Sequence, residues 1–424
     1  MDWDLAPPPP VELADRDVPR LGDELAGRRI AMLVCGGIAA MKTPLVARAL
    51  RKHGAEVTAF ASPEALRYVA EDALAWATGR GVIRRLSPAA EHLSGHAPFD
   101  GYLLPQATYD TINKVAHGIA DHALTTVLAA ALGRLERGEA AVLVAPAMHG
   151  SMHNAVLTAS LRRLRELGVR LVKPREAYGK HNMPDEAVLV AEVCRALASI
   201  ARRSPLAGRP ILVTGGPTPV PIDAVRRITT RFSGKLGLAI AERLYLEGAD
   251  VWLIHGDGAF AAPAWLPHSV ARTYDAYRAA VHQRLAAGDV VAGVFAAAVA
   301  DYQPVEVLPG KTPSGRSFSI ALEPTAKVID EVRAAHPTLP MVTFKYLEDV
   351  SHDQLMAVAG ERLRRFEVVV ANRGEELGCG GAHIAWLLAR GQQPQRLDGK
   401  PAIARAIAEH LKTLLKDRPT TEPP

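Results

Sequence analysis

Short apolar runs alternate with longer stretches in which apolar residues recur every three or four positions, beginning near residue 29. The first pattern predicts buried strands and the second predicts amphipathic helices. In the first half of the chain we expect strands at 29–35, 56–62, 101–104, 141–145 and 169–173. We expect helices there at 39–53, 110–135, 154–167 and 185–202. Continuous apolar strands that alternate with helices indicate a parallel sheet covered on both faces.

The alternation stops at residues 203–210 (RSPLAGRP), a segment typical of a linker, and then starts again. In the second half we expect strands at 211–216, 250–255, 290–297, 341–344 and 367–371, and helices at 235–248 and 401–416. The predicted fold class is α/β, with two doubly wound, Rossmann-like parallel-sheet domains in tandem. The predicted parts are a flexible Pro-rich leader (1–28), a first domain (29–202), a linker (203–209), a second domain (210–416) and a disordered tail (417–424).

The composition is that of a folded protein: of 424 residues, 48% are hydrophobic and 22% are charged. No run approaches the roughly 18 to 20 apolar residues that a membrane span needs. The three cysteines, Cys35, Cys194 and Cys379, are far apart and lack metal-ligand spacing, which favours a reducing cytoplasm. The net charge is +5, but Lys and Arg are spread through the chain. We therefore expect phosphorylated small molecules as partners, and neither nucleic acid nor a membrane.

Ligands of open α/β sheets bind beyond the carboxyl ends of the strands, so the residues that follow the strands are candidates. Gly36 and Gly37 follow the first strand, and Gly215 and Gly216 follow the first strand of the second half. Small residues there let backbone N–H groups approach a phosphate at a helix N-terminus, although a tight turn explains the same glycines. Neither segment has the GxGxxG pattern of a dinucleotide site.

Three further residues carry charge or titrate near predicted strand ends. Asp301 follows the run AAAVA and suits Mg²⁺ or a ligand hydroxyl, or else a helix N-cap or turn. Lys311 lies in a loop just beyond, where both a phosphate contact and a solvated side chain are open. His92 precedes a strand, and the ordinary pKa of a histidine is close to neutral pH. A surface or structural role also stays open for His92.

Taken together, residues 28–390 resemble the bifunctional coenzyme A biosynthesis family, in which a phosphopantothenoylcysteine decarboxylase precedes a phosphopantothenate–cysteine ligase. In the first half, the matching segments are Gly36–Ala40, Asn113–Asp121 and Ala145–Met148. In the second half, they are Val213–Thr218, Pro221–Arg226, Ser233–Gly237, Ala297–Tyr302, Glu323–Lys327 and Val370–Asn372. The order of the two halves is that of the family as well.

For the first half, the resemblance implies an FMN-dependent flavoprotein domain that assembles as a homo-oligomer, trimer-based or dimeric. Gly36 and Gly37 match the turn that binds the FMN phosphate, and Ser62 and Thr108 match flavin contacts. His92 matches the catalytic histidine of the family.

Three features of the first half depart from the family pattern. Asp110 and His149 stand where the family has asparagines that contact the substrate. Residues 176–184 (EAYGKHNMP) stand where the family has a substrate clamp with a catalytic cysteine, and they contain no cysteine. A histidine cannot reproduce the donor and acceptor of an amide, and without the cysteine acid the reaction could stop at an oxidised enethiol. We expect FMN to bind, with its chemistry open between decarboxylation, another redox step and a structural role.

For the second half, the resemblance implies that the carboxylate of phosphopantothenate attacks the α-phosphate of CTP, or ATP in some branches. The amine of cysteine then attacks the acyl-nucleotidylate. Lys311 matches a mobile catalytic lysine, and Arg226 matches an arginine beside the intermediate. The positions that match the nucleotide site are Gly215, Gly216, Ala298, Asp301, Lys327, Phe344 and Asn372, with Asp301 also the Mg²⁺ candidate. Thr230 replaces an asparagine that holds the intermediate. The part of the site that binds the acid therefore departs from the family pattern more than the part that binds the nucleotide.

Three functions stay open on this sequence. The first is coenzyme A synthesis, with ligation of phosphopantothenate to cysteine. The second is a paralogue in another cofactor or natural-product pathway that acts on a different carboxylic acid. The third is a non-catalytic flavin-binding or regulatory subunit, and the retained His92, Lys311 and Asp301 argue against it.

Overall fold

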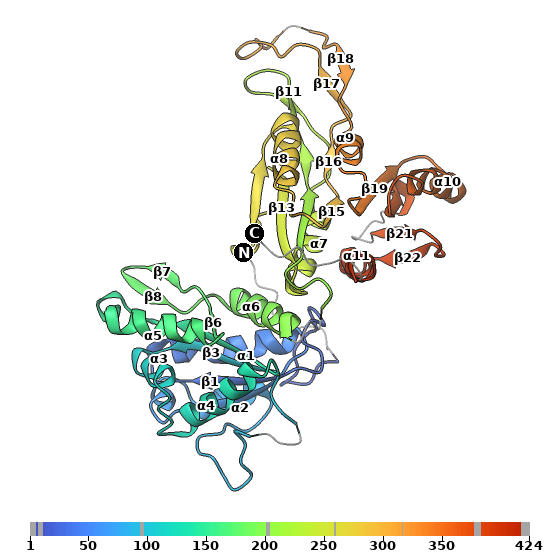
Figure 1. Cartoon of the computed structure of the whole chain (residues 1–424). Helices are drawn as coiled ribbons and strands as arrows, with labels where there is room; N and C mark the ends of the chain where they lie inside the picture. The colour runs from blue at the N-terminus through green and yellow to red at the C-terminus, as the bar shows by residue number, and fades with distance from the viewer. Residues whose placement is uncertain are drawn as a thin grey trace. The chain divides into compact units, whose positions relative to one another are not determined.

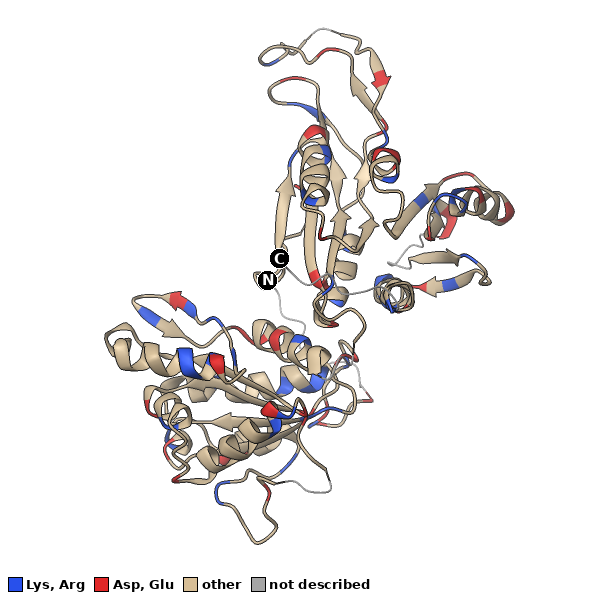
Figure 2. Ribbon diagram, viewed as in Figure 1, with Lys and Arg blue, Asp and Glu red and all other residues tan. Residues whose placement is uncertain are grey.

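The computed structural model describes residue 6 and residues 12–93, 97–200, 204–257, 260–315, 317–376 and 383–416. The chain divides into two compact units, Met1–Arg203 and Ser204–Pro424, each with its own sheet (Figure 1). Basic and acidic side chains are interspersed over both units, as the sequence indicated (Figure 2). Among the described helices, none has the length and apolar character that crossing a membrane requires. The predicted tail 417–424 lies outside the described residues.

The first unit is built around a parallel sheet with the strand order β2-β1-β3-β4-β6. Its strands are β1 (Arg29–Val34), β2 (Glu56–Ala61), β3 (Gly101–Ala107), β4 (Ala141–Pro146) and β6 (Arg170–Leu171). Its α-helices are α1 (Thr43–Lys52), α2 (Glu71–Thr78), α3 (Tyr109–Ala116), α4 (Ala123–Glu136), α5 (Ala155–Glu166) and α6 (Glu186–Ser199). Short 3-10 helices are η1 (Ile38–Lys42), η2 (Ala65–Arg67) and η3 (Gly150–Met152). Strands β3 and β4 are buried throughout because helices cover both faces of the sheet (Figure 1).

A small antiparallel sheet stands beside this main sheet and was not predicted. It consists of β5 (Met148–His149), β7 (Arg175–Ala177) and β8 (Lys180–Asn182), in the order β5-β8-β7. Strand β5 follows directly on β4, so the small sheet begins at the carboxyl edge of the main sheet.

The second unit contains a mixed sheet with the order β14-β13-β9-β15-β19-β20-β21-β22. Its strands are β9 (Pro210–Gly215), β13 (Asp250–Gly256), β14 (His268–Ala271), β15 (Ala292–Phe295), β19 (Met341–Leu347), β20 (Val368–Arg373), β21 (Ile384–Ala389) and β22 (Gln395–Asp398). Its helices are α7 (Lys235–Leu246), α8 (Tyr274–Ala286), α9 (Val328–Ala335), α10 (His352–Leu363), η5 (Gly374–Glu376) and α11 (Lys400–Leu415). Three two-stranded pairs complete it: β10 (Pro217–Thr218) with β16 (Ala298–Val299), β11 (Val220–Pro221) with β12 (Arg227–Ile228), and β17 (Tyr302–Pro304) with β18 (Leu322–Pro324).

The predicted α/β class with two tandem parallel-sheet units is confirmed, with two corrections. The single helix expected at 110–135 is wrong: α3 ends at Ala116, and Gly118, at φ 71°, turns the chain before α4 begins. The sheet of the second unit also has an antiparallel edge, because β21 and β22 return as a hairpin. An apolar run such as that of β21 indicates burial, but it does not indicate strand direction.

The end of the segment predicted as leader and the described part of the predicted linker are packed. The amides of Leu21 and Leu25 donate to the carbonyls of Lys52 and His53, and the side chain of Leu25 is fully buried. The flexible leader predicted at 1–28 is therefore corrected for residues 21–28. In the predicted linker, residues 204–209, Leu206 is fully buried as well.

Replacing Leu25 with alanine is expected to destabilise the protein by about 2–5 kcal/mol, the usual effect of emptying a leucine site in a core. Leu21 is 68% exposed and only four residues away, so Leu21→Ala serves as the control and should stay within about 0.5 kcal/mol. Urea denaturation of both variants measures the difference. Equal midpoints would contradict the docking of residues 21–28.

Candidate active sites

The turns that follow β1, β2 and β3 meet at the carboxyl edge of the first sheet. A Cβ atom on Gly37 would lie 3.3 Å from Cγ2 of Thr108, and a Cβ atom on Gly36 would lie 2.3 Å from Cβ of Glu64. The amide of Ser62 donates to the last carbonyl of β1 over 3.0 Å. The structure thus brings together the four residues predicted for FMN, and the backbone at Gly36 has no room for a side chain.

The two hydroxyls of this group also shape the turns. Oγ of Ser62 accepts the amide of Ala65 at 3.1 Å, and Oγ1 of Thr108 caps α3 by accepting the amide of Thr111. Because the hydroxyl of Ser62 acts as an acceptor there, its own proton is free to be donated to a ligand.

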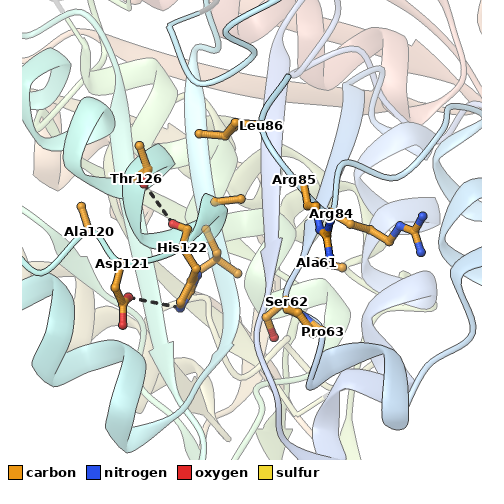
Figure 3. A pocket seen from close by; sticks show the side chains of 12 residues that line it. Ala61, Ser62, Pro63, Arg84, Arg85, Leu86, Ala120, Asp121, His122 and Thr126 are labelled. Carbon is orange, nitrogen blue, oxygen red and sulfur yellow. Dashed lines mark hydrogen bonds and ion pairs between the residues drawn. The ribbon is translucent and has the colours of Figure 1, made fainter. Parts of the chain in front are cut away.

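A cavity of about 350 Å³ opens beside Ser62 (Figure 3). Residues 61–63, 84–86, 120–124 and 126 line it. Arg84 and Arg85 bring positive charge from one side, and Asp121 and His122, 3.7 Å apart, lie on the other. Of the residues predicted for FMN, only Ser62 lines this cavity.

His92 is not among the residues that line the cavity. Its Nδ1 atom is buried and has no hydrogen-bond partner within the described residues. The loop is held beside it, because Glu91 accepts hydrogen bonds from the hydroxyl of Ser87 at 2.6 Å and from its amide at 2.9 Å. These bonds hold the pKa of Glu91 below its usual range.

The two substituted substrate positions have local partners. Asp110 pairs with Lys114 at 3.2 Å, one turn along α3. Nδ1 of His149 lies 2.8 Å from Oγ of Ser151 and accepts its amide at 3.2 Å. Neither side chain lines the cavity beside Ser62.

A larger cavity of about 910 Å³ lies in the second unit, among the carboxyl ends of its parallel strands and the N-termini of α7 and α9. Seven of the predicted residues line it: Gly216, Thr230, Ala298, Asp301, Lys327, Phe344 and Asn372. Gly215, Arg226 and Lys311 do not.

Glycines set the shape of this cavity. A Cβ atom on Gly237, in the first turn of α7, would lie 2.8 Å from Cα of Gly215, and one on Gly234 would lie 2.5 Å from Cα of Gly216. Gly216 and Gly234 have φ angles of 76° and 79°, which glycine adopts without strain. The carbonyl of Gly216 accepts the amide of Ala298 at 2.9 Å. Backbone therefore packs on backbone, and the N-terminus of α7 opens into the cavity.

The charged lining of the cavity is mostly basic. The basic side chains are those of Arg231, Lys235, Lys327, Lys345, Arg362 and Lys400, whereas Asp301 supplies the one carboxylate among the described residues of the lining. Asp301 pairs with Lys327, the residue before α9. Burial lowers the pKa of Arg362. Such a lining suits a ligand that carries several negative charges.

The loop that carries Lys311 is anchored by hydrogen bonds to Asp223 and Arg226. The buried carboxylate of Asp223 accepts the amides of Val225, Arg226 and Thr312 at 2.8, 2.7 and 3.1 Å, and these bonds hold the pKa of Asp223 well below its usual range. Nη1 of Arg226 donates to the same carboxylate at 2.7 Å and to the carbonyl of Thr312 at 3.0 Å. Lys311 is exposed and precedes Thr312, so its backbone is held near this turn while its side chain faces solvent.

Several cavity residues escaped the sequence reasoning. Nη2 of Arg231 donates to the hydroxyl of Tyr346 at 2.9 Å and pairs with Glu348, while Phe232 packs edge-on against the Tyr346 ring. Burial raises the pKa of Tyr346. His383 also lines the cavity, with Nε2 buried and without a partner among the described residues. The strand predicted at 341–344 is followed by the polar residues Lys345 and Tyr346. This pattern was the sequence signal that could have identified Tyr346 as a cavity residue.

Comparison with known proteins matches each of the two units to a protein family. The flavoprotein family model matches residues 20–198, and the model of the DNA/pantothenate metabolism flavoprotein C-terminal domain matches residues 206–415. The coenzyme A biosynthesis bifunctional protein CoaBC of Thermococcus kodakarensis is 33% identical over 363 residues, which cover 84% of this chain and 87% of that protein. The CoaBC protein of Methanocaldococcus jannaschii is 27% identical over 397 residues, covering 92% and 95%. This chain belongs to the CoaBC family.

Membership of the CoaBC family confirms the predicted resemblance, the order of the two halves and the enzyme class, a ligase half with a decarboxylase-like flavoprotein half. A solved C-terminal domain of a CoaBC protein is 27% identical to this chain, with a TM-score of 0.42, and it covers 50% of this chain and 99% of its own length. The roles of individual residues stay predictions.

Adding one methyl group at Gly237 is expected to destabilise the protein by about 1–3 kcal/mol, because the new Cβ would overlap the backbone of Gly215. Gly360 in α10 is the matched control, since a Cβ there meets nothing within 4 Å. Gly360→Ala should stabilise the protein by about 0.5–1 kcal/mol. Urea denaturation compares the two variants, and a neutral Gly237→Ala would contradict the contact between α7 and β9.

Proposed function

We propose that the second unit joins 4′-phosphopantothenate to cysteine by nucleotide-dependent activation, and that the first unit is an FMN-dependent decarboxylase of the product. CTP is the proposed nucleotide, with ATP as the alternative. The observation that carries the ligase half is the large basic cavity, where seven predicted residues face one space beside the N-terminus of α7. A nucleoside triphosphate and a phosphorylated acid bring many negative charges together, and the basic lining offsets their repulsion.

In the proposed ligation, the carboxylate oxygen of phosphopantothenate attacks the α-phosphorus, and the bond to the bridging oxygen breaks to release pyrophosphate. The amine of cysteine then attacks the acyl carbon, the nucleoside monophosphate leaves, and the amine loses a proton. Lys327 and Lys345 line the cavity where the phosphates would lie, and Lys311 would have to reach them from its exposed position beside the anchored Thr312. The described residues offer no group of three or more side chains suited to a metal ion. Mg²⁺ would therefore be held mainly by the phosphates, with Asp301 as its protein ligand.

The first unit fits FMN at the meeting point of three turns. Glu64 approaches Gly36 so closely that only glycine fits there, and Thr108 lies beside Gly37, so the phosphate of FMN would meet the backbone amides of this turn. Bound there, FMN would supply two-electron oxidation of the thiol-bearing carbon of the substrate. His92 lies outside the cavity of its own chain, which supports a homo-oligomer, trimer-based or dimeric, whose site is completed between subunits.

A paralogue acting on another carboxylic acid is the second candidate, and one observation favours it. The hydroxyl of Thr230 donates to the carbonyl of Ala298 at 3.4 Å, so it is engaged with the protein rather than presented as an amide would be. Arg231 then adds a positive charge at the same end of the cavity. Cys35 and Cys194, the cysteines that the structure describes, are both buried, which suits a reducing, cytoplasmic setting under either proposal.

Pyrophosphate release tests the ligase proposal. The purified protein receives Mg²⁺, 4′-phosphopantothenate and cysteine, with CTP in one reaction and ATP in another, and its visible spectrum is recorded. We expect pyrophosphate release that requires the acid, from a protein with a flavin spectrum. Nucleotide binding without release in either reaction would exclude coenzyme A synthesis and favour the paralogue.

Lys311→Ala is expected to lower the rate of pyrophosphate release by about two orders of magnitude, in line with the loss of a charge that stabilises the transition state. Lys416, exposed at the end of α11, is the control for a lost surface lysine, and Lys416→Ala should match the wild type. An unchanged rate in Lys311→Ala would remove this lysine from the mechanism.

A further inference from the structure

The large cavity of the second unit is lined by one histidine among the residues that the structure describes, His383. Strand β21 and helix α11 lie side by side (Figure 1), and His383 directly precedes β21. The carbonyl of His383 accepts the amide of Gly399, the N-cap of α11, at 2.9 Å. This bond fixes His383 beside the start of α11, whose first residue, Lys400, lines the same cavity.

The ring of His383 has a nitrogen without a partner. The residue is half-buried, and its Nε2 atom is buried with no hydrogen-bond partner among the described residues. Buried polar atoms are normally hydrogen-bonded, because an unpaired one has lost its contact with water without compensation. By contrast, the hydroxyl of Tyr346 in the same lining is hydrogen-bonded to Arg231. His383 therefore lacks a partner that a ligand in the cavity could supply.

Lys400 is the charged group that acts on this ring. Burial and the positive charge of Lys400 both lower the pKa of His383, so its ring is neutral at neutral pH. Lys400 stands at the first position of α11, where the helix dipole adds to its positive charge. The ring is thus held in its uncharged form, with one N–H group and one bare nitrogen.

The other charged or titratable groups around β21 are engaged elsewhere. On β22 and at the end of β20, basic and acidic side chains are paired with each other: Arg396 with Asp398 at 2.7 Å and Arg373 with Glu376 at 3.3 Å. His352 of α10 packs against the ring of Trp386, with 4.5 Å between the ring centroids. Within the described residues, Lys400 is therefore the one charge that moves the pKa of His383.

The surroundings of His383 select the chemistry of its partner. The N–H group of a neutral imidazole needs an acceptor, and the positive charge of Lys400 favours an anionic one. The same charge disfavours a cationic group such as the ammonium of cysteine. We propose that His383 binds a phosphate group of a substrate and takes up a proton from solvent as that group arrives. This inference rests on the proposed binding of phosphorylated substrates to the second unit, but not on their ligation.

A phosphate reverses the electrostatic balance around the ring. The charge of Lys400 opposes protonation of His383, whereas a phosphate dianion beside the ring favours it. The protonated ring then donates a charge-assisted hydrogen bond, which is stronger than that of a neutral ring. The pKa of His383 is therefore higher in the complex than in the free protein. Because the proton is taken up on binding, the affinity should fall as the pH rises through the pKa of the ligand-bound ring.

Isothermal titration calorimetry in buffers with different enthalpies of ionisation measures the proton uptake. The full chain is titrated with CTP, ATP and 4′-phosphopantothenate, each alone and with Mg²⁺, so that no ligation takes place. We expect wild type to take up as much as about one proton per ligand in at least one of these titrations. The titration that shows the uptake tells whether the nucleotide or the acid supplies the phosphate group.

Two variants separate the hydrogen bond from the proton. His383→Phe should bind that ligand about ten- to a hundredfold more weakly and without this uptake, because it has neither a donor nor a titrating nitrogen. His383→Gln retains an N–H donor, so it should recover part of the affinity but none of the uptake. His336→Gln, at the end of α9 and outside the cavity lining, is the control and should match wild type. Comparison with the control cancels protons exchanged by the ligand itself.

The outcomes separate this inference from the ligase proposal. If wild type binds the ligands and both His383 variants match it in affinity and proton uptake, the inference is overturned and the ligase proposal stands. Weaker binding with unchanged proton uptake would also overturn the inference, since it would indicate a structural role of the ring. If wild type binds neither nucleotide nor 4′-phosphopantothenate, the ligase proposal fails and the inference falls with it.

Discussion

Helix α7 lies against the end of β9 with no side chain between them, and the large cavity of the second unit depends on this contact. Glycines occupy both sides of the approach, at Gly215 and Gly216 and at Gly234 and Gly237. A methyl group on Gly234, the N-cap of α7, or on Gly237 would overlap backbone that has no freedom to move away. The contact brings the N-terminus of α7, with its unpaired N–H groups, beside the carboxyl ends of the parallel strands.

Basic side chains from separate elements then converge on that space. Lys235 comes from α7, Lys327 from the start of α9, Lys345 from β19 and Lys400 from the start of α11. Their mutual repulsion is unfavourable, and an anionic ligand would relieve it, so binding of such a ligand would stabilise this end of the unit. Two of these charges are balanced within the described residues, Lys327 by Asp301 and Arg231 by Glu348.

Two structures of the first unit lie at the carboxyl edge of its main sheet: the turns after β1, β2 and β3, and the small antiparallel sheet that contains the β7–β8 hairpin. The glycine-rich turn after β1 and the capped turns at Ser62 and Thr108 leave exposed backbone where a phosphate is proposed to bind. Beside them, His181 of the β7–β8 hairpin is hydrogen-bonded to His153, which is also bonded to Thr158 of α5.

The sequence by itself determined the two α/β halves, most of the buried strands and the residues at their carboxyl ends. These are local properties: apolar runs report burial, and small residues after a strand report a close approach. The family resemblance predicted seven residues of the large cavity, although they lie far apart along the chain. Only the tertiary structure decided the antiparallel edge at β21, because direction is not encoded in an apolar run. It alone joined Arg231 to Tyr346 and His153 to His181, since such contacts depend on which loops meet once distant strands have paired.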